Sequence, residues 1–440
     1  MRITCQTGSG SVIRRAGRLL AILAAAIAAG TAATEDFRIL SVTRDGVLSW
    51  SGAFPSGVCT IEAAPAPTGP WLPQASYFTT ASGGMAQLPP GTVNRFHRLV
   101  AADVSPTPQG FENLTRAYGR IRTVAGLGQF GRDGLNNWLP EYEGGPATNA
   151  NLSRPHFAMA DAAGNIYIAD KDSHSILQVT LDGMIHTVAG THQPGDDGDG
   201  PAPATSLSLS YPNGEWVKPD GTVYILDTGN SKIRKLDTNG IMTTLATVPA
   251  GITVGRGLWV NDNETLAYFI SGTAVRRWTQ AGGFKTLNDN FKEPGNLVVD
   301  PAGRLIVTDR GAHRVYHVKQ DGSRDPIAGN GGTTGGGDGF PALDTGLYGV
   351  RGVWFLPAGG YLLATHQGSQ IWYVDAAGII HLFVDGAPTD VHDGDGGYFR
   401  AEGPKISEVR SVSVDPRGNV LITENDFGYI RQIDLLPFQP

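Results

Sequence analysis

The sequence has almost no cysteine, and this excludes a scaffold held together by disulfide bonds. Its 440 residues include two cysteines, Cys5 and Cys59. If the N-terminal segment is removed on export, Cys59 has no partner for an intramolecular disulfide. Cys59 lies in the strand-like run Val58–Ile61. We expect it to be a buried small apolar residue, with a nucleophilic role as the alternative.

Charged residues are also scarce, at 17% of the chain, and the formal net charge is −7. No basic stripe runs through the sequence, so we expect no nucleic-acid partner. No nucleophile-elbow motif, P-loop or dinucleotide fingerprint stands in a fitting context. The Gly-rich run GNGGTTGGGDG lies between expected strands rather than before a helix, which disfavours a phosphate-binding loop. The common catalytic classes that carry sharp motifs are therefore not indicated.

No apolar run is long enough to span a bilayer comfortably. The longest near the N-terminus is Leu19–Gly30, preceded by Arg14, Arg15 and Arg18 and followed by small residues. This order predicts a secretory signal at residues 1–33, with cleavage near Ala33. We therefore expect a secreted or periplasmic monomer with no membrane span after signal removal. A retained membrane anchor and a twin-arginine export route are the alternatives.

Glycine and proline are abundant instead, with 60 and 28 residues respectively. That much turn chemistry favours many short strands over long helices, so the predicted fold class is all-β. Residues 36–104 read as a small immunoglobulin-like or fibronectin-like β domain, with Trp50, Trp71 and Phe96 as its expected core. Residues 105–117 are expected to form a linker, and residues 118–440 a repeat domain.

The repeat domain contains one segment pattern six times. Asp161-AAGNIYIAD is matched by Lys218-PDGTVYILD and Asp300-PAGRLIVTD, for example. The pattern begins at positions 161, 218, 261, 300, 356 and 415. These starts are 39 to 59 residues apart. Repeats of roughly this length that contain only strands indicate the blades of a β-propeller. Each unit shows four strand-like runs with a period of two, as half-buried strands require.

The sixth unit ends near Ile433 without a fourth strand. The run Ile121-RTVAG matches Ile185-HTVAG and comes before the first complete unit. We therefore expect Ile121–Val124 to complete the last blade and close a ring of six blades, which leaves no open edge between blades.

These repeats resemble the NHL repeat. The resemblance is carried by IYIADKDSHSILQV, VYILDTGNSKIRKL and LIVTDRGAHRVYHV, and it covers about residues 118–435. It implies a six-bladed NHL-type propeller of a secreted bacterial kind. Three units depart from the pattern at the residue where the others have Asp, with Ile270, Thr365 and Glu424.

In propellers of this type, the residues that begin each first strand face one mouth of the ring. The aligned residues there are His156, Asn213, Arg256, Gly295, Arg351 and Arg410. Arginine presents a permanent cation in a planar fork that grips carboxylate, sulfate or phosphate. The predicted ligand-binding residues are Arg256, Arg351, Arg410, Asn213, Asn296 and Arg310. The alternative is that each arginine pairs with a nearby acid and rigidifies the ring.

The loops after the second strands add acids and imidazoles to the same face. Asp170, Asp227, Asp309 and Glu424 end these strands, and we expect them to fix their own turns. Beside them stand Lys171, His174, Arg310, His313, His366 and Asn425. We name His156 and His366 as catalytic candidates, because an unperturbed imidazole pKa suits proton transfer near neutrality. Zinc held by His156, His313 and His366 is a weaker alternative, so we assign no metal ligand.

Four of the six long connectors carry Asp-Gly pairs. These are Gly131–Gly134, Gly195–Gly200, Gly337–Gly339 and Asp393–Gly397. Asp-Gly pairs favour tight turns, because glycine accepts positive φ. Clustered Asp oxygens also suit calcium, which we retain as a possible cofactor.

Two functions fit these features. The first is a non-catalytic secreted binding module or scaffold that recognises an anionic glycan, peptide or protein surface at its loop-rich face. The second is a lyase or hydrolase that acts on an anionic carbohydrate or lactone in the propeller channel. A fold hosts many functions, so the resemblance does not choose between them.

Overall fold

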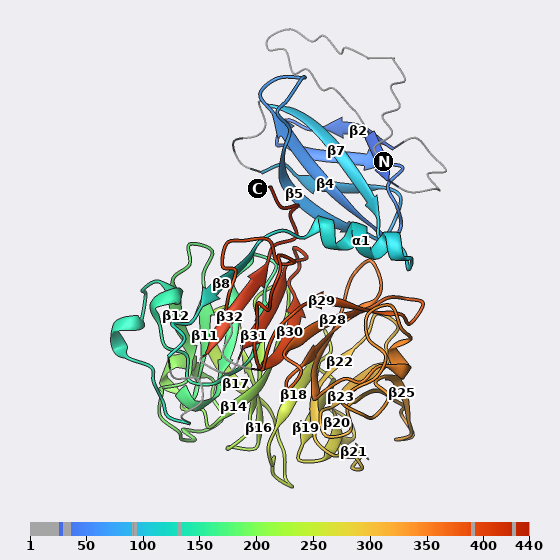
Figure 1. Ribbon diagram of the computed structural model, residues 1–440. Helices are drawn as coiled ribbons and strands as arrows, with labels where there is room; N and C mark the ends of the chain where they lie inside the picture. The colour runs from blue at the N-terminus through green and yellow to red at the C-terminus, as the bar shows by residue number, and fades with distance from the viewer. Residues whose placement is uncertain are drawn as a thin grey trace. The chain divides into compact units, whose positions relative to one another are not determined.

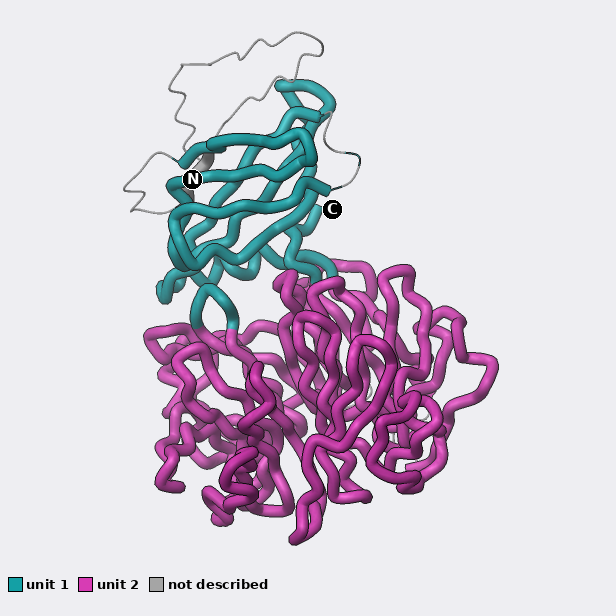
Figure 2. Tube along the Cα trace, turned by 180° about the vertical axis from the view of Figure 1, so that it is seen from behind, with its two compact units in different colours: residues 1–120, 356–359, 434–440 teal, residues 121–355, 360–433 magenta. Residues whose placement is uncertain are grey.

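The structure is a computed structural model that describes residues 26–29, 37–89, 91, 95–129, 134–388, 392–424 and 428–439. The chain divides into two compact units, which Figure 2 shows in different colours. Unit 1 comprises residues 1–120, 356–359 and 434–440, and unit 2 comprises residues 121–355 and 360–433. Most of the predicted signal, residues 1–25 and 30–33, lies outside the described part of the chain.

Unit 1 contains two small sheets, in the orders β1-β7-β4-β5 and β2-β3-β6. Their strands are β1 (Ala26–Ala29), β2 (Arg38–Val42), β3 (Val47–Ser51), β4 (Gly57–Ala64), β5 (Leu72–Thr79), β6 (Gly84–Gln87) and β7 (Phe96–Asp103). Residues of both sheets share one core, as the buried Leu48, Trp50, Ile61 and Leu99 show. Of the three aromatics predicted for this core, Trp50 alone is fully inside it, whereas Trp71 lies under the guanidinium of Arg98.

Cys59 is a free, fully buried thiol in this core, as predicted. Burial raises its pKa to about 12, so it is not a reactive thiolate.

The segment predicted as a linker contains the helix α1 (Pro108–Ala117), which we did not expect from the sequence. The Thr107 side chain accepts a hydrogen bond from the Gly110 N–H at 2.9 Å, and Pro108 fits the first turn. Phe111, Leu114 and Ala117 are buried. The polar residues and prolines of this segment favour a connection, but Thr107-Pro108 is also a signal for the start of a helix.

Unit 2 contains six antiparallel sheets within the described residues, here called blades 1 to 6 (Figure 1). Blade 1 has β9 (Pro155–Ala160), β10 (Ile166–Asp170), β11 (Ser175–Val179) and β12 (Ile185–Ala189). Blade 2 has β14 (Pro212–Val217), β15 (Val223–Asp227), β16 (Lys232–Leu236), β17 (Ile241–Thr247) and, at its outer edge, β13 (Ala202–Pro203). Blade 3 has β18 (Arg256–Val260), β19 (Leu266–Ser271), β20 (Ala274–Thr279) and β21 (Gly283–Asn288).

Blades 4 to 6 repeat the same order. Blade 4 has β22 (Pro294–Val299), β23 (Leu305–Asp309), β24 (Arg314–Val318) and β25 (Arg324–Ala328). Blade 5 has β26 (Val350–Phe355), β27 (Tyr361–Thr365), β28 (Gln370–Val374) and β29 (Ile380–Val384). Blade 6 has β30 (Val409–Val414), β31 (Val420–Glu424), β32 (Tyr429–Ile433) and β8 (Ile121–Ala125). Short 3-10 turns lie in the connectors at Pro140–Tyr142, Ala147–Asn149, Lys171–Ser173, Ala204–Ser206 and Ala342–Asp344.

The ring closes as the sequence predicted. β8 pairs antiparallel with β32, with Ile121 opposite Ile433, so the strand before the first repeat completes blade 6. The first strands contact one another in the cyclic order β9, β14, β18, β22, β26, β30 and back to β9. A hydrogen bond of 2.7 Å from the Ser413 hydroxyl to the Ala158 carbonyl joins blade 6 to blade 1.

The core of unit 2 lies between neighbouring blades. Leu177 and Leu421 share one buried cluster between blades 1 and 6, and Ile306 and Leu363 share another between blades 4 and 5. The first strands approach closely, because a Cβ on Gly257, whose φ is +50°, would lie 2.8 Å from the Asn296 side chain of blade 4. This close packing fixes the first strands and therefore the side chains at their starts.

Candidate functional site

The candidate site is built on the first residues of the first strands, where each blade has a register shift. In β26, for example, Val350 pairs with Thr365 and Gly352 with Ala364, which leaves Arg351 as the extra residue. In β30, Arg410 is the extra residue between Val409 and Ser411 in the same way. A bulge of this kind re-aims a side chain that regular alternation would place elsewhere.

Six of the predicted residues belong to one electrostatic cluster, here called the mouth cluster. It consists of His156, Arg256, Arg310, Arg351, His366 and Arg410. They come from blades 1, 3, 4, 5 and 6, yet the charges of Arg410, Arg351 and Arg256 act on His156, and those of Arg351, Arg410 and Arg310 act on His366. The charge of Arg256 in blade 3 also acts on Arg410 in blade 6, the opposite blade, as expected where the side chains point towards the axis of the ring.

Two of the four arginines in the mouth cluster share one acid. Glu293 lies 3.3 Å from the Arg256 guanidinium and 2.6 Å from that of Arg310. Arg256 also donates to the Pro294 carbonyl at 3.1 Å. For these two arginines, the expected alternative of pairing with a nearby acid is what the structure has.

Arg351 and Arg410 differ from that pair. Among the described residues, no carboxylate oxygen lies within 4.0 Å of either guanidinium. Arg351 is 4% exposed. Burial, followed by the charges of Arg410 and Arg256, lowers the pKa of Arg351 well below its usual value, and burial with the charge of Arg154 lowers that of Arg410 to about 9. A guanidinium stays protonated in proteins, so the two side chains form a positive site, buried at Arg351 and partly buried at Arg410, that an anion would stabilise.

The two histidines do not have the expected unperturbed pKa values. Burial, and then the charges of Arg410 and Arg351, lowers the pKa of His156 well below its usual value. The same causes lower the pKa of His366 to about 2. The premise of an unperturbed imidazole pKa therefore does not hold in the free protein, because both rings are buried among arginines, and the catalytic assignment of the two histidines stays a prediction. Each ring has one buried nitrogen without a hydrogen-bond partner, Nε2 of His156 and Nδ1 of His366.

The two predicted asparagines are buried near the starts of their strands, but neither hydrogen-bonds an arginine within the described part of the chain. Asn296 accepts from the Leu297 N–H at 2.8 Å, and its Nδ2 has no partner. Asn213 has an unpartnered, buried Oδ1.

Sequence reasoning missed Glu293 and Arg154, which act on the mouth cluster, and left Lys171 out of the proposed ligand-binding set. Arg154 lies 3.7 Å from Asp172, and Lys171 lies 3.1 Å from the same side chain. Arg154 and Glu293 each stand immediately before the proline that begins a first strand. Extending the aligned columns by two positions upstream of His156 and Gly295 would have found both.

The acids that end the second strands have structural roles, but the contacts below hold the connector that enters the blade rather than the acid's own turn as expected. Oδ2 of Asp170 accepts the Ser153 N–H at 2.9 Å, and Oδ1 of Asp227 accepts the Ser210 N–H at 2.8 Å. Asp309 accepts the N–H groups of Lys292 and Glu293, and Glu424 that of Ser407. Each acid thus fastens the connector that enters its own blade. Asn425 lies outside the described residues.

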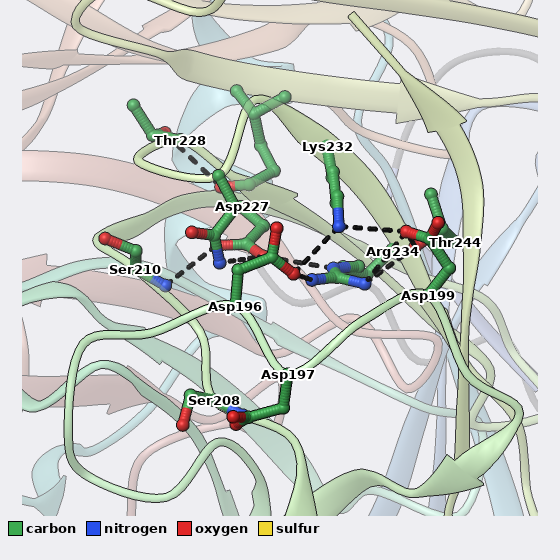
Figure 3. A network of polar contacts seen from close by, with 12 residues as sticks. Asp196, Asp197, Asp199, Ser208, Ser210, Asp227, Thr228, Lys232, Arg234 and Thr244 are labelled. Atoms are coloured by element: carbon green, nitrogen blue, oxygen red, sulfur yellow. Dashed lines mark hydrogen bonds and ion pairs between the residues drawn. The ribbon is translucent and has the colours of Figure 1, made fainter.

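The Asp-Gly connectors are also fastened to the blades. In blade 2, Asp196 and Asp199 lie 2.8 and 2.9 Å from Lys232, and Asp196 lies 3.0 Å from the buried Arg234, as Figure 3 shows. Arg234 also pairs with Asp227 at 3.0 Å. In blade 6, Arg431 makes the matching contacts with Asp395 at 3.0 Å and Glu424 at 3.3 Å.

The same connectors hold the outermost strands. The N–H groups of Thr123, Thr187 and Leu382 donate to Asp395, Glu143 and Asp338, each at 2.7 to 2.9 Å. The Thr244 hydroxyl donates to Asp199 at 2.9 Å. These acids therefore cap the edge of four blades.

No group of three or more His, Cys, Asp or Glu side chains that could hold a metal occurs among the described residues. The Asp oxygens considered for calcium at Gly195–Gly200 are engaged by Lys232 and Arg234, and residues 131–133 lie outside the described part. Of the three histidines considered for zinc, His313 accepts the Gly349 N–H at 3.0 Å. The described residues thus offer no assembled set of metal ligands.

A cleft of about 790 Å³ lies away from the mouth cluster, in the connectors of blades 1 and 2. It is lined by Trp138, Glu143, Thr187 and His192 among others. The rings of Trp138 and His192 stack at 4.8 Å, so each covers a face of the other.

Known proteins resemble this chain mainly in fold. No protein-family model matches it. Teneurin-m of Drosophila melanogaster is 35% identical over 105 residues, a match that covers 21% of this chain and 4% of that protein.

Two solved structures are similar over nearly the whole chain. A structural genomics protein of unknown function from Bacteroides thetaiotaomicron has 12% identity, a TM-score of 0.55, and coverage of 92% of this chain and 100% of its own. An auxiliary nutrient binding protein from Bacteroides ovatus has 12% identity and a TM-score of 0.53. The match covers 91% of this chain and 98% of that protein. Such coverage is too large for unit 2 alone and extends into unit 1. This likeness shows the all-β propeller fold. No helix in the described residues is long and apolar enough to cross a membrane.

Proposed function

We propose that this protein is an exported binding protein that holds an anionic ligand at the mouth cluster. The ligand classes are an anionic glycan, a peptide or an acidic protein surface. The observation that carries the proposal is the pair Arg351 and Arg410 on neighbouring blades. Arg351 is buried, Arg410 is partly buried with an unpartnered Nε, and neither has a carboxylate within 4.0 Å among the described residues. Buried cations are costly unless they are paired, so a ligand anion is the natural partner.

Binding is favoured over catalysis by the state of the imidazoles. His156 and His366 are neutral in the free protein because burial and the arginines lower their pKa values. Bases this weak take up a proton poorly at neutral pH, whereas a neutral imidazole still donates one hydrogen bond to a ligand. The proposal therefore assigns them to ligand contact.

The similar proteins are consistent with this role. The auxiliary nutrient binding protein of Bacteroides ovatus carries a binding function in its name. At 12% identity this is an analogy of fold, so the ligand must be established on this chain. The NHL assignment and export through residues 1–33 belong to the same proposal, and N-terminal sequencing of the exported protein tests the cleavage near Ala33.

The test is thermal unfolding and titration calorimetry of the mature protein at low salt, with sulfate, glucuronate and neutral glucose as probes. Sulfate and glucuronate are expected to raise the melting temperature and glucose to leave it unchanged. A ligand at a hundred times its dissociation constant stabilises the native state by about 2.7 kcal/mol. The variants Arg351→Met and Arg410→Met should lose this response. Arg277→Met is the matched control, because Arg277 lies on β20 away from the cluster and contacts Gln320. An equal anion response in all four proteins would refute the proposed site.

A further inference from the structure

The axis of the propeller is blocked by tryptophans. Trp216 belongs to β14 of blade 2 and Trp354 to β26 of blade 5. In the cyclic order of the six first strands, these blades lie opposite each other. Their indole rings are nevertheless 5.7 Å apart, and Trp259 of blade 3 lies 6.2 Å from Trp216. Side chains from opposite blades make contact only where they cross the axis, so the channel is closed at this level.

The blocked level lies directly below the mouth cluster along the same strands. Trp354 follows Arg351, and Trp259 follows Arg256, by three positions. The extra residue near the start of each strand lets both members of each pair face the axis. At about 3.3 Å per residue, the tryptophans lie roughly 10 Å or less below the arginines.

Burial is uneven within the mouth cluster. Arg256, Arg310 and Arg410 are partly exposed. Arg351 and His366 are buried, with only 4% and 6% of each residue exposed. A group that reaches Arg351 must therefore be narrow and must shed its own water.

The local charge favours an anionic group at this depth. Arg154 and Lys171 join the four arginines of the mouth cluster in this region. Arg154 and Lys171 contact Asp172, and Arg256 and Arg310 contact Glu293. Arg351 and Arg410 therefore keep their positive charge without an ion pair among the described residues.

From the closed axis, the narrow access and this charge, we propose that the protein recognises its ligand end-on. A terminal anionic group of a sugar or peptide chain enters the mouth and contacts Arg351 and Arg410, and the rest of the chain stays outside. The tryptophan level prevents a chain from passing through, so internal segments of an anionic polymer are not bound. This inference rests on the proposed function and adds that the recognised group is a chain end.

The experiment is to count the protein copies bound per chain. Short and long oligomers of α-1,4-linked galacturonate carry a carboxylate on every unit but have the same number of ends. Titration calorimetry and sedimentation of the mature protein give the stoichiometry and the affinity per mole of chain. Under end-on recognition, both are expected to be independent of chain length. Arg351→Met should abolish binding of both oligomers, and Arg277→Met should preserve it.

Two contrary outcomes are distinguishable. If the number of copies per chain rises with length, internal segments are bound and the end-on inference is overturned, while the anion site stands. If none of the three probes binds (the oligomers, monomeric glucuronate and sulfate), the proposed function itself fails.

Discussion

Arg234 and Asp227 form an ion pair of 3.0 Å in which both side chains are fully buried. The pair links β16 to β15 within blade 2, and the guanidinium also contacts Asp196 and Thr244 (Figure 3). It donates to the Gly198 carbonyl as well. Arg431 and Glu424 form the counterpart in blade 6. Blades 1, 4 and 5 have the apolar or aromatic residues Leu177, Tyr316 and Trp372 at the matching position.

We predict that Arg234→Met lowers the free energy of unfolding by about 3–5 kcal/mol, because it leaves Asp227 buried without its cation. The double variant Arg234→Met with Asp227→Asn should lose less than the sum of the single changes. Chemical denaturation of the full chain measures both. Additive losses would mean that the pair does not act as a unit.

Glu215 stands in β14 where the other blades have apolar residues such as Leu258 and Val353, and it is 1% exposed. Burial raises its pKa well above the usual value. A carboxyl with a raised native pKa contributes its full stability below the unfolded value, about 4.5, and loses it as the pH rises towards the native pKa.

Between pH 4 and pH 8, the stability of Glu215→Gln relative to the wild type is therefore expected to increase once the pH rises above about 4.5. Thermal unfolding of both proteins across this range measures the difference. Glu264→Gln is the control, and its stability relative to the wild type should change with pH in the opposite direction. The reason is that Lys235 and Tyr224 lower the pKa of Glu264. A Glu215→Gln variant whose stability relative to the wild type is lower at pH 8 than at pH 4 would contradict the prediction.

Arg351→Met should stabilise the free protein while it removes anion binding. The change deletes a buried cation without an ionic partner in the described residues, and an unsatisfied buried polar group costs about 1–3 kcal/mol, or more when charged. The melting temperature without ligand measures the first effect and the sulfate response the second. A lower melting temperature with unchanged sulfate response would show that Arg351 serves the scaffold.

Gly257→Ala should destabilise the ring at the contact between blades 3 and 4. Its φ is +50°, and the new Cβ would lie 2.8 Å from the Asn296 side chain and 2.9 Å from the Leu297 backbone nitrogen. Gly183→Ala is the matched control, since its φ is +82° but nothing lies within 4 Å of the new Cβ.

Both glycine variants pay the left-handed backbone cost of about 1–3 kcal/mol. Gly257→Ala should therefore lose more than the control by the cost of the clash. Equal losses in denaturant unfolding would show that the first strands can move apart freely.

The sequence by itself determined the propeller, its repeat pattern and the strand that closes it. These features depend on local alternation and turn chemistry, so Ile121–Val124 could be assigned to the last blade from its likeness to Ile185–Val188. It also placed Arg256, Arg351 and Arg410 at equivalent positions.

The tertiary structure alone decided which of these arginines is free of an acid. Glu293 engages Arg256 and Arg310 and leaves Arg351 and Arg410. It also lowered the histidine pKa values and brought Trp216 to Trp354 across the axis. Burial, charge pairing and contacts between opposite blades depend on residues far apart in sequence, and no local pattern encodes them.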